Sequence, residues 1–253
     1  NQAVAMARLG AEVEMFGCVG KDANGEILIK NLNQNGVVTK NIKRVEGVYT
    51  GIATITVGEN DNAIVVVAGA NEKVDCDYID MIKEDLLNSE LVVLQHEIPL
   101  ETVKYAIDIC YEKGVKILLN PAPAYALNEE LIKKVTYITP NEHEAKIIFG
   151  GNNKLEDLLR KYKEKLIVTL GEKGVVCCLS DGNILQVPCR KSNVVDTTGA
   201  GDTLNGALAA QIAEGVSLKK ALRFANIAAG MSVEKFGAQN GMPCRAEVEK
   251  EFK

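Results

Sequence analysis

The sequence of 253 residues has no tryptophan, two histidines and only 5% aromatic residues. No apolar run approaches the roughly 18 residues that a bilayer-spanning helix requires, and no charged-then-apolar signal opens the chain. The formal net charge is -5, and no run of basic residues occurs. Nucleic acid and anionic membrane surfaces are therefore not expected as main partners, because both require clustered Lys and Arg. We expect a cytoplasmic protein.

The common cysteine motifs are also missing, although the chain contains seven cysteines. Their odd number and scattered positions, without a C-x-x-C pair, fit neither a disulfide framework nor a zinc site. Cys177 and Cys178 lie in the strand-like run 175–179, where buried thiols are expected. A nucleophilic cysteine with His96 or His143 as its base is the less favoured alternative.

Three well-known nucleotide-binding signatures are absent. The chain has no G-x-x-x-x-G-K-[ST] motif and no G-x-G-x-x-G motif, and it lacks the protein-kinase signatures. A bound nucleotide must therefore be held by another kind of loop.

The chain does contain enough apolar residues, 47% of the total, for the core of one large domain. Helical and strand patterns alternate along it, which predicts parallel strands with helices on both faces, an α/β fold. Two β-branched runs, 49–57 and 63–67, are joined by the turn-forming residues 59–62 and predict a hairpin that we interpret as a lid or dimer element. The other predicted strands are 12–19, 91–95, 115–120 and 136–139, and the predicted helices are 1–10, 22–34, 77–87, 100–113, 128–134, 203–214, 217–233 and 246–252.

The most informative stretch is 194–207. Its apolar residues 194–195 are typical of a strand, and they are followed by small residues and then by a helical pattern. The segment 199–201 would let backbone N–H groups approach a bound oxyanion at the start of a helix. Asp202 then either caps this helix or faces the reacting group of a ligand, and the local sequence leaves both interpretations open.

Four other segments directly follow predicted strands, at 95–97, 120–123, 140–144 and 169–174. In an open α/β sheet, ligands bind outside the carboxyl ends of the strands. We therefore expect these segments, together with the start of the helix at Asp202, to border a ligand site.

The segment 196–203, Asp-Thr-Thr-Gly-Ala-Gly-Asp-Thr, resembles the C-terminal signature D-T-x-[GA]-A-G-D of the PfkB family of sugar and nucleoside kinases, also called the ribokinase family. Three further motifs occur in the order that the family has. Residues 141–144 are similar to its N-x-x-E motif, 169–174 to its nucleotide loop, and 1–5 to the tail of its N-terminal G-G-K-G-A-N motif. The resemblance covers essentially the whole chain.

This resemblance implies a three-layer α/β/α sandwich with a mainly parallel sheet and a small β lid, to which residues 49–67 contribute. We expect residues 1–253 to form one kinase domain that is incomplete at its N-terminus. The family's first strand, an early sugar-binding Asp and two glycines of the first motif would all precede Asn1.

Within the family, residues 1–5, 95–97 and 235–238 look most like those of ribokinases. The implied activity is ATP-dependent phosphorylation of the 5-hydroxyl of D-ribose to ribose 5-phosphate, with Mg²⁺ required, K⁺ as activator and a homodimer formed through the lid. Another kinase of the family, acting on fructose, a nucleoside or a keto-deoxy sugar acid, is an alternative, as is a catalytically incomplete ligand-binding fragment. The scarcity of aromatic residues disfavours the nucleoside, whose base tends to need an aromatic or apolar pocket.

The resemblance also implies roles for single residues. Asp202 is the expected base for the sugar hydroxyl, Asn1 and Glu97 are expected to contact the sugar with it, and Glu144 is expected to order Mg²⁺. The expected anion hole consists of Gly199, Ala200 and Gly201. The expected ATP-binding residues are Asn141, Thr169, Leu170, Gly171, Glu172, Lys173, Gly174, Gly201 and Asn226. The expected K⁺ site consists of Asp196, Thr198, Ser232, Lys235, Gly237 and Gly241.

Several of these residues have a second interpretation that the sequence leaves open. Asn141 could cap a helix, and Glu97 could be a solvated loop acid. Gly171 and Gly174 could belong to an ordinary turn at a strand end. Gly241 stands where the family would have a small hydroxyl residue, so the sequence leaves its part in the cation site open.

Overall fold

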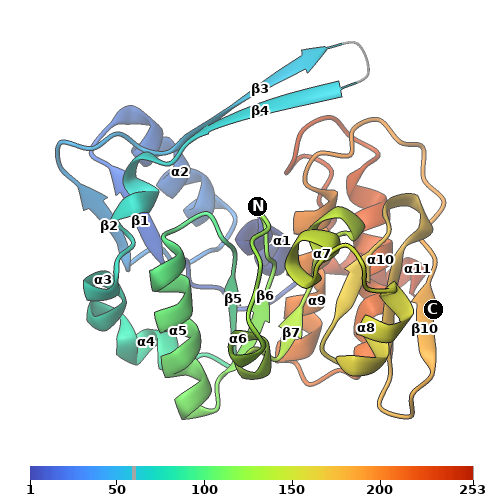
Figure 1. The fold of residues 1–253 in the computed structure, drawn as a ribbon. Helices are drawn as coiled ribbons and strands as arrows, with labels where there is room; N and C mark the ends of the chain where they lie inside the picture. The colour runs from blue at the N-terminus through green and yellow to red at the C-terminus, as the bar shows by residue number, and fades with distance from the viewer. Residues whose placement is uncertain (59–60, 253) are drawn as a thin grey trace.

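The computed structural model describes residues 1–58 and 61–252, and it has helices on both faces of a central sheet (Figure 1). In their order across the sheet, the strands are β5 (Leu91–Leu94), β6 (Lys116–Leu119), β7 (Tyr137–Ile138), β8 (Ile167–Thr169), β9 (Val175–Cys178) and β10 (Ile184–Val187). The first three are parallel, and a parallel bridge between Ile138 and Leu166 leads from β7 toward β8. Strands β9 and β10 then continue the sheet in antiparallel fashion.

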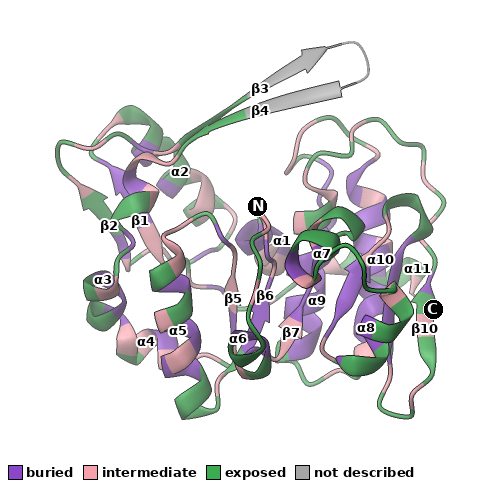
Figure 2. Cartoon of the chain, in the orientation of Figure 1, coloured by how far each residue is buried: buried purple, intermediate pink, exposed green. Residues whose placement is uncertain are grey.

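Two groups of helices cover this sheet. One face carries α3 (Cys76–Met81), α4 (Lys83–Leu87), α5 (Leu100–Lys113), α6 (Glu129–Lys134), α7 (Glu142–Phe149) and α8 (Leu155–Lys161). The other face carries α1 (Gln2–Arg8), α9 (Ala200–Ala213), α10 (Leu218–Ser232) and α11 (Arg245–Glu251). Figure 2 shows that helices of both groups contain buried residues, and in α9 these form the unbroken run 203–212.

The position of β6 between the two groups of helices explains why its sequence is continuously apolar. Ile117 and Leu119 belong to the core under the first group of helices, whereas Leu118 belongs to the core under the second group. All three are fully buried, because a strand covered on both faces has no solvated side. The arrangement confirms the predicted three-layer α/β/α fold with a mainly parallel sheet.

A smaller unit consists of β1 (Gly17–Gly20) and β2 (Ile42–Val45), which pair in parallel, and of α2 (Ala23–Gln34). Val19, Ile29 and Ile42 form its buried cluster. This unit carries the hairpin of β3 (Ile52–Gly58) and β4 (Asp61–Val67), which are antiparallel as predicted. The hairpin extends across the upper side of the molecule in the view of Figure 1.

The base of the hairpin is fixed by a buried threonine. Thr50 donates to the Asp22 carboxylate from its backbone N–H and from its hydroxyl, both at 2.7 Å, and its hydroxyl accepts from the N–H of Gly20 at 2.9 Å. Side chains near the base, among them Ile52 and Val67, are about half exposed. Residues 59 and 60 of the predicted turn lie outside the described residues.

Two local predictions are wrong, and one strand was missed. Residues 194–195 form no strand; they lie in an exposed loop, where the N–H of Val195 donates to the carbonyl of Val233 at 2.8 Å. The predicted helix 77–87 is divided into α3 and α4 at Ile82, a buried residue that is anchored in the core. Strand β10 was not predicted; it is a short strand at the edge of the sheet, and only one of its four residues is buried.

Four of the seven cysteines are buried, namely Cys18, Cys110, Cys177 and Cys178. All seven are free, and burial raises the pKa of Cys177 to about 12, which leaves it protonated and without nucleophilic character. This finding agrees with the predicted structural role of Cys177 and Cys178. Within the described ranges, none of the helices combines the length and the hydropathy needed to cross a membrane.

Candidate active site

Asp202 lies in the first turn of α9 but is not its cap. Gly199 occupies the cap position with a φ of 79°, and a Cβ on it would lie 2.7 Å from the carbonyl oxygen of Ala238. Only glycine satisfies the positive φ and this close approach together. The interpretation of Asp202 as a helix cap is therefore wrong, and its half-buried carboxylate is available to other groups.

The start of α9 offers backbone donors to an anion. The first-turn N–H groups of a helix have no intrahelical acceptor, and they lie at the positive end of the helix dipole. The N–H of Ala200 is already used, because it donates to the carbonyl of Thr197 at 3.2 Å. Gly201 and Asp202 supply the freer donors, and a Cβ on Gly201 would meet no atom within 4 Å. The space beside Gly201 can therefore admit an anionic group.

Two amide side chains at the start of α1 hold the Asp202 carboxylate. Asn1 Nδ2 donates to Asp202 Oδ2 at 2.8 Å, and Gln2 Nε2 donates to Asp202 Oδ1 at 3.1 Å. Helix α1 can come this close because Gly206 of α9 has no side chain; a Cβ there would lie 2.6 Å from Cβ of Ala5. The sequence predicts Asn1 at the site, but it gives no signal for Gln2.

Glu97 follows β5 and shares the electrostatic environment of Asp202. Its side chain reaches solvent, yet surrounding protein desolvates the carboxylate and raises its pKa, and the negative charge of Asp202 raises the pKa further. Glu97 is thus an exposed loop acid, as the alternative interpretation has it, and it also lies close enough to Asp202 for their charges to interact. The preceding His96 is buried, and its Nδ1 lies 3.0 Å from the carbonyl oxygen of Pro123, so it connects two strand ends.

Asn141 and Glu144 cap helix α7 reciprocally. Asn141 Oδ1 accepts from the N–H of Glu144 at 2.8 Å, and Glu144 Oε2 accepts from the N–H of Asn141 at 2.7 Å. The alternative of a helix cap is thus realised. Burial raises the pKa of Glu144, although the N–H of Asn141 opposes this shift. In the described part of the chain, no three His, Cys, Asp or Glu residues cluster as ligands for a metal ion.

The predicted nucleotide loop connects β8 and β9 beside Asn141. A parallel bridge pairs Asn141 with Thr169, and the chain then forms the 3-10 turn η2 (Gly171–Lys173). Gly174 has a φ of 88°, and a Cβ on it would lie 2.0 Å from the carbonyl oxygen of Val187. Glycine is therefore required there for close packing against the chain after β10.

Asn226 contacts that same chain segment. It is buried on α10, and its Nδ2 donates to the carbonyl oxygens of Val187 at 2.7 Å and Pro188 at 3.3 Å. The structure thus brings Asn226 and Gly174 to the same segment, at the carbonyl oxygen of Val187. Because its NH₂ group is used there, only the carbonyl of the Asn226 side chain could contact a ligand directly.

The predicted cation residues meet where the loop after α10 approaches α9. Asp196 Oδ1 accepts from the N–H and the hydroxyl of Thr198 at 2.9 and 2.7 Å, and its Oδ2 accepts from the N–H of Gly237 at 2.8 Å. The hydroxyl of Thr198 and the two N–H groups lower the pKa of Asp196. Lys235 is exposed, and among the described residues no Lys or Arg forms an ion pair with Asp196.

Gly241 has a steric reason to be glycine. A Cβ on it would lie 1.9 Å from the backbone carbonyl oxygen of Ser232, which is the last residue of α10. The small hydroxyl residue that was expected at this position would not fit this backbone. Ser232 itself is buried, and its hydroxyl donates to the carbonyl of Ala229 at 2.8 Å. Gly241 could therefore offer a cation only its backbone carbonyl, whereas Ser232 could offer its carbonyl or the lone pairs of its hydroxyl oxygen.

Comparison with known proteins places this geometry in a family. The model of the family described as "pfkB family carbohydrate kinase" matches residues 1–245. The chain belongs to the pfkB family. A ribokinase of Lactococcus lactis subsp. lactis is 48% identical over 255 residues, which cover 100% of this chain and 84% of that relative. The predicted resemblance and the predicted enzyme class, a carbohydrate kinase, are thereby confirmed.

Solved structures give the same assignment for this pfkB family chain. Ribokinase from Thermotoga maritima superposes with a TM-score of 0.87 at 35% identity, covering 98% of this chain and 84% of the other. Ribokinase from Arabidopsis thaliana complexed with ribose and ATP superposes with a TM-score of 0.88 at 29% identity, covering 100% and 85%. The three-layer fold is thus the one that these kinases have.

In this pfkB family member, Gln2 and Asn1 have hydrogen-bond partners whose roles the motifs alone do not show. Gln95 and Asn120 lie directly after β5 and β6, in the segments 95–97 and 120–123 that were expected to border a ligand site, but neither was given a role of its own. Gln95 Nε2 donates to Gln2 Oε1 at 2.9 Å, and Gln2 Nε2 donates to Asn120 Oδ1 at 2.9 Å. Gln239 Nε2 donates to Asn1 Oδ1 at 2.9 Å from the loop after α10. These partners lie far from one another in the sequence.

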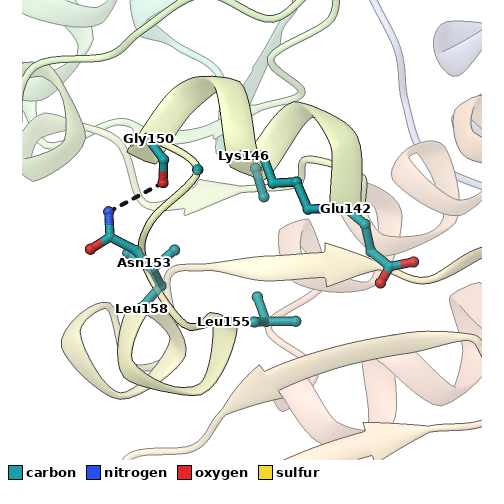
Figure 3. A pocket seen from close by; sticks show the side chains of 8 residues that line it. Glu142, Lys146, Gly150, Asn153, Leu155 and Leu158 are labelled. Carbon is teal, nitrogen blue, oxygen red and sulfur yellow. Dashed lines mark hydrogen bonds between the residues drawn. The ribbon is translucent and has the colours of Figure 1, made fainter.

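A small cavity of about 130 Å³ lies apart from these residues, between α7 and α8 (Figure 3). Glu142 and Lys146 of α7 line it together with Leu155 and Leu158 of α8. None of its lining residues is among the predicted site residues. Its apolar floor belongs to ordinary packing between the two helices.

Proposed function

We propose that the protein transfers the γ-phosphoryl group of ATP to the 5-hydroxyl of D-ribose and forms ribose 5-phosphate. The ribokinase relatives support ribose as the sugar, and the Arabidopsis thaliana neighbour complexed with ribose and ATP supports the pair of substrates. The observation that carries the proposal is the Asp202 carboxylate, which lies at the N-terminus of α9 beside the freer N–H groups of Gly201 and Asp202.

The proposed reaction places both partners of the transfer at this helix start. The 5-hydroxyl oxygen attacks the γ-phosphorus, the bond from that phosphorus to the oxygen bridging to the β-phosphate breaks, and ADP leaves. Asp202 takes the proton of the hydroxyl, which is lost late in a largely dissociative transfer. The first-turn N–H groups of α9 stabilise the negative charge on the phosphoryl oxygens as it moves. Asn1 and Glu97 contact the sugar hydroxyls.

We propose that ATP lies along the segments that follow β7 and β8. The site consists of Asn141, the loop Thr169, Leu170, Gly171, Glu172, Lys173 and Gly174, the helix start at Gly201, and Asn226. Mg²⁺ neutralises charge on the phosphates when bound, and Glu144 would hold it through water. A single nearby carboxylate fits this role, because Mg²⁺ keeps several waters and binds mainly through substrate phosphates.

We further propose a K⁺ site at the loop after α10. Among the described residues Asp196 has no Lys or Arg ion-pair partner, and its two oxygens accept only from the neutral groups of Thr198 and Gly237, so its negative charge is left for a cation. Thr198, Ser232, Lys235, Gly237 and Gly241 complete the proposed site. Because Gly199 packs directly against Ala238, an ion in this loop would stabilise the helix start that receives the phosphoryl group.

We propose a cytoplasmic homodimer formed through the hairpin of β3 and β4. The hairpin supports this proposal because Val65, Val66 and Val67 are all more than half exposed, although successive strand residues point to opposite faces. One face would then lie over the sugar and the other against a second subunit. Seven free thiols fit a reducing compartment.

The decisive experiment combines a substrate panel with the variant Asp202→Asn. Ribose should be phosphorylated by ATP far faster than fructose, adenosine or a keto-deoxy sugar acid. Asp202→Asn should lower kcat by about 10² to 10⁴ with little change in ATP affinity, because it removes a proton acceptor and not a nucleotide contact. Turnover of the variant within a few-fold of the natural rate would remove Asp202 from the base role. A faster reaction on another sugar would overturn the choice of ribose.

A further inference from the structure

The Asp202 carboxylate is held by amides alone. Each of its oxygens accepts from one amide NH₂ group, Oδ2 from Asn1 and Oδ1 from Gln2. In the described ranges no Lys or Arg forms an ion pair with it. Neutral donors fix the direction of a carboxylate without cancelling its charge. Because each oxygen accepts only one of these hydrogen bonds, it keeps a lone pair that can accept a further hydrogen.

Gln2 is the better anchored of the two amides. Its side chain is 8% exposed, and all its polar atoms have partners: Nε2 donates to Asp202 and to Asn120, and Oε1 accepts from Gln95. Asn120 in turn donates from Nδ2 to the carbonyl of Thr139 at 3.0 Å, so its Oδ1 must be the atom that faces Gln2. Because these neighbours fix which end is the donor, a flipped Gln2 amide would face the wrong groups on both sides.

A second chain of amides reaches the other oxygen. Asn31 Nδ2 of α2 donates to Gln239 Oε1 at 2.9 Å, and Gln239 Nε2 donates to Asn1 Oδ1 at 2.9 Å. This leaves Asn1 Nδ2 as the atom that faces Asp202. Two relays, one from the strand end after β5 and one from α2, therefore converge on the same carboxylate.

We propose that Gln2 is a positioning residue that, with Asn1, sets the direction of the Asp202 carboxylate toward the sugar hydroxyl, and that Gln95 acts through Gln2. The inference rests on the proposed function of Asp202 as base. It makes a specific claim about rate, because a misplacement of about 1 Å in a reacting group can cost 10²-fold. Gln2 itself touches neither the sugar nor ATP in this proposal.

The test uses near-isosteric methionine variants in steady-state assays with ribose and ATP. Gln2→Met should lower kcat by about 10- to 100-fold, while KM for both substrates changes by less than about 3-fold. The matched control is Gln211→Met. Gln211 is also a buried glutamine, but it lies on α9, far along that helix from Asp202. The control should keep kcat within about 2-fold of the natural value.

A double-mutant cycle separates positioning from general loosening. Gln95→Met should lower kcat by about 3- to 10-fold in the natural background, but it should have no further effect when Gln2 is already Met. Independent structural damage would instead multiply in the double variant. If Gln2→Met does not fold by circular dichroism, Gln95→Met decides alone, since its natural kcat would overturn the relay.

The outcomes distinguish this inference from the proposed function. Natural kcat in Gln2→Met, alongside a slow Asp202→Asn, would overturn the inference and leave the base in place. A raised KM for ribose with unchanged kcat would also overturn it, because Gln2 would then act in binding. Natural turnover in Asp202→Asn would instead remove the proposed base, whatever Gln2 does.

Discussion

The replacement Gly206→Ala tests how closely stability and catalysis are connected in this molecule. Gly206 is the point at which α9 touches α1. A Cβ there would lie 2.6 Å from Cβ of Ala5, 2.8 Å from the backbone oxygen of Gln2 and 3.1 Å from the backbone nitrogen of Met6. Carbon atoms in contact are normally about 3.5 to 4.0 Å apart, so α1 would have to move away by roughly 1 Å.

The energetic cost follows from two opposing effects. Forcing an extra methyl group into a packed contact typically costs about 1 to 3 kcal/mol. Alanine in a helix interior recovers about 1 kcal/mol relative to glycine. We therefore expect the free energy of unfolding to fall by about 0 to 2 kcal/mol. For a chain of this size, Tm should fall by no more than about 8 °C.

The catalytic cost should be larger than the cost in stability. The two hydrogen bonds to Asp202 from Asn1 and Gln2 are 2.8 and 3.1 Å long, and a shift of α1 by about 1 Å would break or weaken both. We expect kcat to fall by about 10- to 100-fold at a temperature at which the variant is fully folded.

Thermal unfolding and steady-state kinetics on the same sample check this reasoning. Adding Ala5→Gly removes the nearest atom and should restore part of kcat, although the contacts with the backbone of Gln2 and Met6 remain. A Gly206→Ala protein with natural Tm and natural kcat would refute it. A loss of Tm without any loss of kcat would show that the approach of α1 matters for packing alone.

Three further predictions concern the ion, the lid and Glu97. Replacing K⁺ by Na⁺ should slow the reaction at constant ionic strength, and equal rates in both salts would argue against the site at Asp196. Light scattering at micromolar concentration should give the mass of a dimer, and a monomer would exclude pairing through the hairpin. The raised pKa of Glu97 means that the folded state binds its proton more tightly than the unfolded state, so stability is lost as pH rises through and above the usual carboxyl range. Glu97→Gln should therefore raise Tm at pH 7.5 but not at a pH below about 4. Equal changes of Tm at both pH values would show that the gain in stability is not electrostatic. The same variant should raise KM for ribose by about 10-fold or more.

Much of the fold could be predicted because local signals and tertiary packing agree. The helix 100–113 has the bounds that were predicted, since Pro99 precedes it and Gly114 ends it in the left-handed conformation. Residues 194–195 misled the prediction because β-branched residues favour strands only where a neighbouring strand is available. Here the loop runs beside α10, and no such partner was readable from the sequence.

The candidate site was predictable only in part. Asp202 and Glu97 could be placed together, because strand ends and the following helix start collect at one edge of an α/β sheet. Gln2 could not be placed, because its role depends on α1 lying against α9, 200 residues away in the sequence. The glycine that permits this contact, Gly206, sits in a helical run, where it suggests only a weak helix position.

The steric demands on the glycines give the site a common logic. Gly199, Gly206 and Gly241 each lie where a Cβ would collide with another segment, namely the loop after α10, helix α1 and the end of α10. The first two contacts lie at the N-terminal half of α9, and the third fixes the loop after α10 that packs against Gly199. The motif G-A-G-D at 199–202 therefore describes only the segment that is proposed to contact the phosphoryl group and the sugar. The position of the Asp202 carboxylate depends on which other segments can pack against this helix start. The amides of Asn1 and Gln2 reach Asp202 only because Gly206 lets α1 lie close to α9.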